Sequence, residues 1–394
     1  MARLPYLSAR LQGFGTTIFA EMSALAARTE AINLGQGFPD TDGPAEVSAA
    51  AIKAIEEGRN QYPPGPGTAD LRLAISEHQR RFWSMDVDPD TEVLVTAGAT
   101  EAIAATMLAL CEVGDEVVVF DPTYDSYGAS IAMAGAKLKP VLLHPPQPGE
   151  SAYRFDPDEL RAAFSAKTRL LLLNTPHNPT GKVFTHDELT LVAELCQEYD
   201  VVAVTDEVYE HLVFDGRHHP LATLPGMMDR TVSISSGGKT FSFTGWKIGW
   251  ATARPELIAA IRTAKQFLTF VNGAPFQPAI AIGLRLGDDY YQQFKAELEA
   301  KRDLLGEWLD RAGLRVHQPQ GTYFTTVDIG PLGETSGVDF CLALPEQAGV
   351  VAVPSQVFYQ DQRDGATQVR FCFAKRDEVI TEAGQRLVSA LAPA

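Results

Sequence analysis

Lys239 is the lysine of this sequence that best suits a role as an amine nucleophile, because it lies in the glycine-rich run SGGKT. A lysine amine becomes a nucleophile when desolvation and a nearby cation lower its pKa from about 10.4. Lys247, eight residues later, is a candidate for that cation and could also face a phosphate. The competing interpretation at both positions is an exposed lysine without a chemical role.

The GGKT ending also invites comparison with the P-loop of nucleotide triphosphatases. That pattern requires a glycine at position 233, where this chain has Ser233. A P-loop opens directly into a helix, whereas residues 241–245 (FSFTG) form helices poorly. The sequence therefore argues against a nucleotide triphosphate site.

Four other groups of polar residues follow short apolar runs. Residues 97–100 (AGAT) place a glycine turn before a predicted helix, whose free N–H groups favour a phosphate. Tyr124 offers a ring that can stack on a planar cofactor. Asn178 lies in the stiff, proline-rich loop NTPHNPTG. Asp206, with Tyr209 three residues on, is costly to bury without a cationic partner such as a pyridinium N–H. For each group, a packing or turn role is the alternative.

Arg370 lies far from these groups along the chain. It alternates with Phe371 and Phe373 and therefore projects from the opposite face of a predicted strand at 369–373. A guanidinium held on a strand suits bidentate binding of a carboxylate. Pairing with one of the 50 acidic residues is the simpler interpretation.

Short apolar runs predict the strands that position most of these groups. They span residues 92–96, 116–120, 169–173, 201–205 and 231–235. Near-continuous Val, Ile and Leu is typical of parallel strands buried on both faces. Helix-period segments at 100–111, 187–199 and 255–267 alternate with them, which predicts an α/β fold. Because ligands bind outside the carboxyl ends of such strands, we expect the groups that follow them to meet at one edge.

The length of 394 residues predicts more than one domain, since single cores stop growing near about 250–300 residues. We predict a mostly parallel large domain at 45–290 and a smaller α+β domain at 291–394. A long charged helix at about 289–312 and a final helix from Asp377 mark the second domain. We expect the N-terminal segment 1–44 to pack with it.

The amino-acid composition indicates which kinds of binding partner are disfavoured. The chain has 33 Lys and Arg against 50 Asp and Glu, a formal charge of -17, which disfavours nucleic acid and anionic membrane surfaces. The four cysteines show no C-x-x-C spacing and indicate core residues in a reducing compartment. Residues 1–5 begin no apolar signal segment, and no stretch of 18 apolar residues occurs, so we expect a cytoplasmic protein. No metal site is predicted.

Four long motifs resemble those of the class I/II aminotransferases, which depend on pyridoxal 5′-phosphate (PLP) and have fold type I. They are NLGQGFPD at 33–40, NTPHNPTG at 174–181, TDEVYEHLVF at 205–214 and SGGKTFSFTGWKIGW at 236–250. The resemblance runs from Arg10 to about Leu387. It is closest to the kynurenine, glutamine and methionine aminotransferases and to the actinobacterial proteins named N-succinyldiaminopimelate aminotransferase.

The resemblance implies a role in cofactor binding for most of the residues above. Lys239 would join PLP as a Schiff base and then act as acid and base in the proton shift. Asp206 would keep the pyridine nitrogen protonated, so that the ring accepts electrons. Tyr124 would stack on the ring, and both Asn178 and Tyr209 would bond its phenolic oxygen. The residues implied to bind the phosphate are Ala99, Thr100, Ser236 and Lys247.

The same resemblance implies the substrate site and the oligomeric state. Arg370, Asn178 and the backbone of Gly37 would bind the substrate α-carboxylate. Tyr62 would reach a phosphate across a dimer interface, so a homodimer is implied.

The expected reaction moves an amino group from an amino acid to a 2-oxo acid such as 2-oxoglutarate. The donor would be N-succinyl-L,L-diaminopimelate or a neutral or aromatic amino acid such as methionine, glutamine or kynurenine. Ile18 and Thr100 replace aromatic residues that the kynurenine enzymes tend to have, which disfavours kynurenine as the preferred donor. The alternative within the same cofactor chemistry is β-elimination from cysteine S-conjugates. A regulator with a PLP domain would need an added basic module, for which the residues before position 45 are too few.

Overall fold

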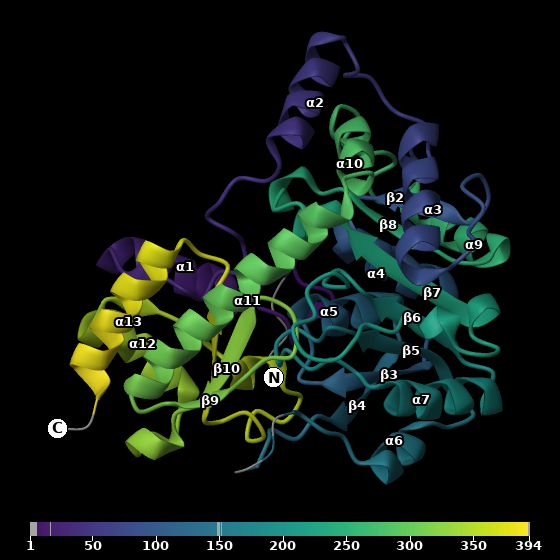
Figure 1. Cartoon of the computed structure of the whole chain (residues 1–394). Coiled ribbons are helices and arrows are strands. Elements are labelled where there is room, and N and C mark those ends of the chain that lie inside the picture. Colours follow the sequence, from purple (N-terminus) through teal and green to yellow (C-terminus); the bar gives the residue numbers. More distant parts are fainter. Residues whose placement is uncertain (1–5, 16, 148–149, 151, 393–394) are drawn as a thin grey trace.

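The computed structural model describes residues 6–15, 17–147, 150 and 152–392, and its centre is a seven-stranded sheet of order β2-β8-β7-β6-β5-β3-β4 (Figure 1). The strands are β2 (Val93–Thr96), β3 (Glu116–Asp121), β4 (Lys137–Leu142), β5 (Thr168–Asn174), β6 (Val202–Asp206), β7 (Thr231–Ser236) and β8 (Gly249–Thr252). All five predicted strands are present, each end within one residue of its predicted position. The prediction of a mostly parallel α/β fold is confirmed.

Sequence reasoning missed strands β4 and β8. Strand β4 lies at the sheet edge and contains two lysines and a proline, so it lacks the apolar run of a central strand. Strand β8 has only four residues and begins with Gly249. It pairs antiparallel with both β2 and β7 and is therefore the one reversed strand of this sheet in the described part of the chain.

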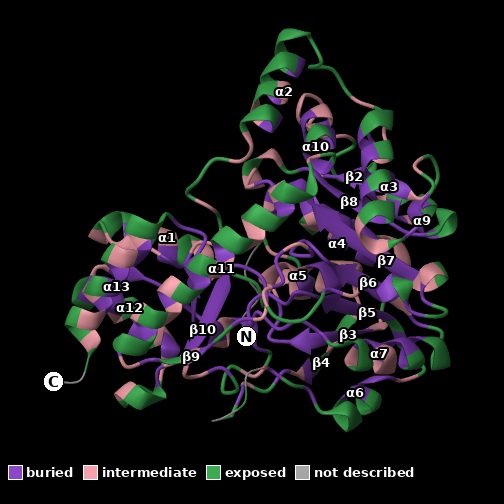
Figure 2. Ribbon diagram, viewed as in Figure 1, coloured by how far each residue is buried: buried purple, intermediate pink, exposed green. Residues whose placement is uncertain are grey.

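Alternate side chains of the strands enter two different core clusters. Val117 and Val119 pack with helices α4 (Gly98–Leu110) and α9 (Pro255–Lys265) on one face. Val118 packs on the other face, where α7 (His186–Glu198) covers the sheet. Burial on both faces is the physical reason for the uninterrupted Val, Ile and Leu runs. Figure 2 shows this as a buried sheet beneath helices whose outer faces are exposed.

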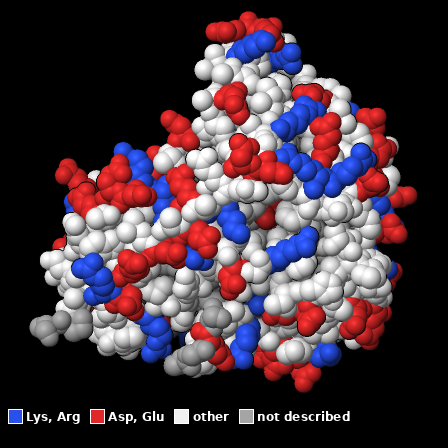
Figure 3. All heavy atoms as spheres, in the orientation of Figure 1, with Lys and Arg blue, Asp and Glu red and all other residues white. Residues whose placement is uncertain are grey.

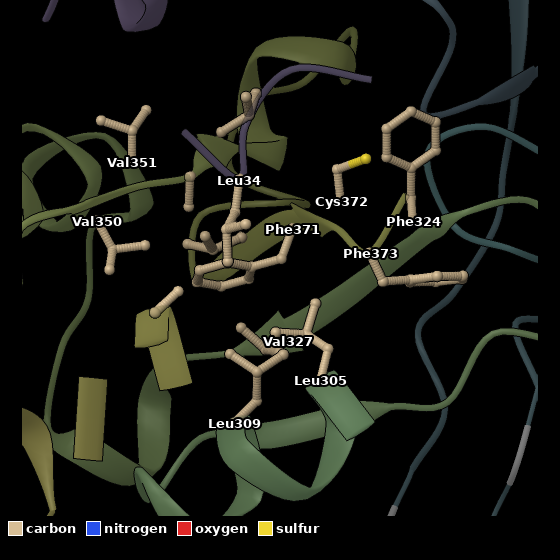
Figure 4. Packing of buried hydrophobic residues seen from close by; sticks show 14 of the residues in the cluster. Leu34, Leu305, Leu309, Phe324, Val327, Val350, Val351, Phe371, Cys372 and Phe373 are labelled. Atoms are coloured by element: carbon tan, nitrogen blue, oxygen red, sulfur yellow. The ribbon is translucent and has the colours of Figure 1, made fainter. Parts of the chain in front are cut away.

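The C-terminal part contains a four-stranded antiparallel sheet of order β12-β13-β10-β9. Its strands are β9 (Arg315–His317), β10 (Phe324–Asp328), β12 (Val353–Pro354) and β13 (Gln368–Cys372). The helices that pack with it are α11 (Asp288–Arg311), α12 (Gly337–Ala348) and α13 (Asp377–Leu391). Figure 4 shows side chains of this core, among them Leu305 and Leu309 beside Val327. The charged helix and the final helix therefore lie where the sequence predicted them.

The N-terminal segment packs with this C-terminal part. Met22 and Ala26 of α1 (Ile18–Thr29) and Leu34 belong to the same buried cluster as Leu305. Strand β1 (Ile32–Asn33) pairs in parallel with β11 (Val350–Val351). Helix α2 (Ala45–Glu56) instead packs against α10 (Phe276–Leu284), which shares a buried cluster with strand β2 of the seven-stranded sheet. These contacts support a boundary near residue 45, and the three-part division stays a prediction.

The described surface carries acidic side chains over the face in Figure 3, with basic side chains between them. No described helix combines the length and the apolar character that crossing a bilayer requires. Cys196, Cys341 and Cys372 are buried free thiols, and Cys111 is partly buried, in agreement with their predicted core positions. Residues 1–5, which entered the localisation argument, lie outside the described range.

Candidate active site

A cavity of about 370 Å³ lies at the carboxyl ends of the central strands. Every residue predicted for the site except Tyr62 lines it. Residues from the N-terminal segment (Gly37) and from strand β13 (Arg370) complete its wall. The cavity therefore joins parts of the chain that the sequence alone could only place separately.

One end of the cavity is built as an anion site. Helix α4 begins at Gly98, and no side chain caps its N-terminus. Ala99 and Thr100, in the first turn, line the cavity with Ser236. Gly98 has φ +74, and a methyl group added there would lie 3.2 Å from the Lys247 amine. Uncapped N–H groups, the positive helix end and an ammonium group together suit a phosphate.

Asp206 supplies a carboxylate to the cavity wall. It ends strand β6 and is buried, and Tyr127 donates a hydrogen bond of 2.7 Å to its Oδ2 atom. Burial raises the pKa of Asp206 to about 6, against the opposing effects of the Tyr127 hydrogen bond and the Lys239 charge. A buried carboxylate in this state favours a cationic or N–H partner.

Lys239 lies in a four-residue helix, α8 (Gly237–Thr240), after which the helix stops, as the FSFTG run predicted. Its Nζ atom donates a hydrogen bond of 2.9 Å to the Tyr323 hydroxyl. The same Nζ lies 5.8 Å from the centre of the Tyr209 ring. Burial raises the pKa of Tyr209 well above its usual value, although the Lys239 charge acts in the opposite direction, so this phenol stays protonated near neutral pH.

Arg370 is 1% exposed, and its hydrogen-bond partners among the described residues, Asn178 Oδ1 and the Gly35 carbonyl oxygen, include no carboxylate. Its Nη1 atom donates a hydrogen bond of 2.7 Å to Asn178 Oδ1, while no described residue accepts a hydrogen bond from its Nε atom. The rings of Phe324, Phe19 and Phe358 surround the guanidinium, with Phe324 at 3.9 Å. Pairing with an acidic side chain, the simpler interpretation at the sequence level, is wrong.

The loop of Asn178 is fixed to the strand that carries Asp206. Asn174, the last residue of β5, accepts a hydrogen bond of 2.6 Å from the Asn178 backbone N–H. Its own amide donates to the Asp206 carbonyl at 2.8 Å. Both X-Pro bonds of the loop, Thr175–Pro176 and Asn178–Pro179, are cis. The predicted stiff loop is present and its amide faces the cavity.

Gly37 and Tyr124 line the cavity as predicted. A methyl group added at Gly37 would collide with the Phe324 ring, the same ring that lies over Arg370. Tyr124 lies edge-on to Tyr127, with ring centres 5.8 Å apart. Tyr62 is elsewhere, 81% exposed and edge-on to Phe270, so this chain alone does not bring it to the site.

Sequence reasoning missed several residues that shape the cavity or its polar contacts, besides Asn174 and Phe324 described above. They are Phe19, Gln36, Tyr127 and Tyr323. Tyr127 carried a usable signal, because it follows Tyr124 by three residues at the start of helix α5 (Asp125–Ala134). Phe19 and Tyr323 had none, since their positions depend on how distant segments pack.

A buried polar cluster lies behind the Tyr209 turn. His78, Glu210 and His211 are the residues of the described chain whose spacing would suit a metal ion. The two imidazole Nε2 atoms already contact each other at 2.7 Å. Glu210 accepts hydrogen bonds from Trp83 and Ser235, both of 2.6 Å. Most of these polar atoms already have partners, and His78 Nδ1 is the buried cluster atom without one among the described residues. The cluster is therefore best described as packing that fixes the turn.

Residues 29–387 match the family model described as aminotransferase class I and II. The chain is 51% identical over 387 residues to the probable N-succinyldiaminopimelate aminotransferase of Mycobacterium tuberculosis, covering 96% of this chain and 97% of that one. It is 39% identical over 379 residues to the methionine aminotransferase of Escherichia coli, covering 96% and 97%. The solved structure of the Mycobacterium tuberculosis N-succinyldiaminopimelate aminotransferase superposes with a TM-score of 0.95 at 50% identity, covering 98% of this chain and 100% of the other.

Proposed function

This chain belongs to the class I and II aminotransferases, and from that premise we propose that it transfers amino groups with PLP held at Lys239. The observation that carries the proposal is the Arg370 guanidinium, which is buried without a carboxylate partner among the described residues. A fully buried cation is costly unless an anion meets it. The carboxylate shared by amino acids and 2-oxo acids meets that requirement.

The residues lining the cavity fit PLP at each of its polar groups. Its phosphate would lie at the uncapped start of α4, with Ser236 and Lys247. Its ring nitrogen would face Asp206, and its phenolic oxygen would face Asn178 and Tyr209. Tyr124 would cover one face of the ring. When bound, PLP supplies an aldehyde that takes up amino groups and a ring that accepts electrons from the substrate carbon.

Two of the chain's own groups would handle protons. The Lys239 amine, which lies in the cavity beside Tyr209, would take the proton from the substrate α-carbon and return it during the transfer. Asp206 would hold a proton on the ring nitrogen, and this cationic N–H would in turn lower the Asp206 pKa from its raised value of about 6. Tyr127 would keep the carboxylate oriented through its 2.7 Å hydrogen bond.

The proposed donor is N-succinyl-L,L-diaminopimelate, supported by the relative with 51% identity that bears this substrate in its name. The proposed acceptor is 2-oxoglutarate or a similar 2-oxo acid. A neutral donor such as methionine is the second candidate, because Phe19 and Gln36 line the cavity beside Arg370 and Gly37. The comparisons give no support to the β-elimination alternative.

We also propose that the enzyme is a homodimer and that it acts in the cytoplasm. Tyr62, Phe267 and Phe270 are 81%, 82% and 53% exposed, a group of aromatic side chains that a second copy of the chain would cover. The buried free cysteines are typical of a reducing compartment.

The test is a pair of half-reactions followed by visible absorbance. Wild-type protein supplied with PLP should turn yellow, lose the colour when a donor is added, and regain it when a 2-oxo acid follows. Lys239→Ala should remain colourless after dialysis and transfer no amino group. Lys53→Ala, which removes a lysine whose side chain is 75% exposed, is the control and should behave as wild type. Turnover by Lys239→Ala would refute the proposal.

A further inference from the structure

Tyr323 connects the reactive lysine to the N-terminal segment. Lys239 Nζ donates a hydrogen bond of 2.9 Å to the Tyr323 hydroxyl. That hydroxyl donates in turn to the Gly37 carbonyl oxygen at 2.6 Å. Lys239, Tyr323 and Gly37 belong to three separate parts of the chain, which meet at one phenolic oxygen.

The protonation state of Tyr323 fixes the direction of this relay. The side chain is fully buried, and burial raises its pKa above the usual value, so the phenol keeps its proton. A neutral phenol has one hydrogen to donate, which goes to the Gly37 carbonyl. The oxygen therefore has only its lone pairs to offer to Lys239, and it accepts the hydrogen bond from the Lys239 amine.

The backbone holds Tyr323 in this place at a conformational cost. Thr322, the preceding residue, has φ +71, a region that β-branched residues rarely adopt. Its N–H donates to the Leu212 carbonyl at 2.9 Å, and its hydroxyl accepts from the Phe324 N–H at 3.2 Å. The Tyr323 ring lies edge-on to Tyr209, with centres 5.1 Å apart. Such strained positions persist where surrounding structure enforces them, commonly at functional sites.

We propose that Tyr323 is a positioning residue for the Lys239 amine, an inference that rests on the proposed function. An amine that takes a proton from the substrate α-carbon must remain close to that carbon. The lysine side chain has four rotatable bonds, so it can move its amine away unless a contact restrains it. The Tyr323 hydroxyl restrains it. Because Gly37 packs against Phe324, which lies over Arg370, the same contact ties the position of the amine to the carboxylate site.

The test compares Tyr323→Phe, which removes only the hydroxyl, with a matched control. Tyr291→Phe removes another buried hydroxyl, which donates a hydrogen bond of 3.2 Å to the Leu284 carbonyl oxygen. Tyr291 does not line the cavity. For Tyr323→Phe we expect kcat with the best donor to fall about tenfold, the effect of losing one hydrogen bond to a charged group. KM for the donor should change by less than about twofold, since Arg370 still binds the carboxylate. The control should keep both constants.

A second readout does not depend on turnover. The rate at which the apoprotein takes up PLP, followed by the yellow absorbance, should also fall about tenfold in Tyr323→Phe. Incorporating 3-fluorotyrosine at position 323 keeps the shape and the hydroxyl but weakens the acceptor, and should give an intermediate rate. If Tyr323→Phe equals wild type in both uptake and kcat, the inference is overturned while the proposed function stands. If wild-type apoprotein takes up no PLP, the proposed function fails and the inference with it.

Discussion

The Arg370 guanidinium donates a 2.7 Å hydrogen bond to the side-chain oxygen of Asn178, a residue 192 positions away in the chain. This contact joins strand β13 to the loop after β5, and the Arg370 Nε atom has no partner in the part of the chain that the structure describes. One edge of the guanidinium is thereby anchored by the protein. The geometry is that of a cation held ready for an anionic ligand.

Replacing Arg370 by lysine should lower kcat/KM for donor and acceptor about 100-fold or more, because an ammonium lacks the planar fork that matches a carboxylate. The yellow absorbance with PLP should remain, since Arg370 is not among the residues proposed to contact the cofactor. Steady-state kinetics and an absorbance scan measure the two effects. Arg315→Lys is the control at an arginine whose side chain is 50% exposed. An unchanged kcat/KM in Arg370→Lys would show that the carboxylate binds elsewhere.

Asp206→Asn should reduce the rate of amino transfer about 100-fold or more, on the scale of losing a preorganised electrostatic contact. The asparagine amide carries no negative charge, so it would not keep the PLP ring nitrogen protonated. Tyr127→Phe removes only the hydrogen bond to Asp206 Oδ2, and should cost about tenfold. Rapid-mixing measurement of the donor half-reaction gives both rates. Equal effects of the two substitutions would contradict the assignment of the charge to Asp206.

Glu210 should make the apoprotein less stable as pH rises. Burial raises its pKa from 4.5 to about 7, so the folded state holds this proton more tightly than the unfolded chain does. This proton therefore adds to the free energy of unfolding in full below about pH 4.5. The contribution, on the order of 3 kcal/mol, is lost as pH rises to about 7. Glu210→Gln should remove this contribution, so the stability of wild type relative to the variant should fall as pH rises. The raised pKa values of Asp206 and Asp121 and the lowered pKa values of the buried His78, His177 and His211 contribute to both proteins and cancel in the difference.

Urea unfolding of wild type and Glu210→Gln at several pH values between about 5 and 8 measures this difference. Glu256→Gln, at a side chain 76% exposed, is the control and should leave the profile unchanged. A difference in the free energy of unfolding between wild type and Glu210→Gln that stays constant over this interval would refute the prediction.

Tyr62→Phe should weaken PLP binding about tenfold even though Tyr62 is 81% exposed in a single chain, because the hydroxyl would bond the phosphate bound by a second copy. Light scattering should give twice the mass of 42.7 kDa for both proteins. Titration of the apoprotein with PLP measures the affinity. A monomeric wild type, or an unchanged affinity in the variant, would contradict the shared site.

Much of the fold could be predicted because its strands are locally encoded. Residues 170–173 and 201–204 are apolar throughout, and burial on both faces of a parallel sheet requires that pattern. The long helix α11 and the final helix α13 were equally clear from their periodicity and charge. Strand β8 was not predictable, since four residues beginning with glycine carry no such pattern.

The sequence by itself determined which chemical groups the protein carries and where each follows a strand, as for Lys239 and Asp206. The tertiary structure alone decided that Arg370 has no acidic partner among the described residues, that Tyr127 bonds Asp206, and that Tyr323 bonds Lys239 across 84 positions. The physical reason is the separation in sequence between the residues that make contact. Strand and helix patterns report local burial and period, whereas contacts between distant segments depend on how whole layers pack, which no local pattern records.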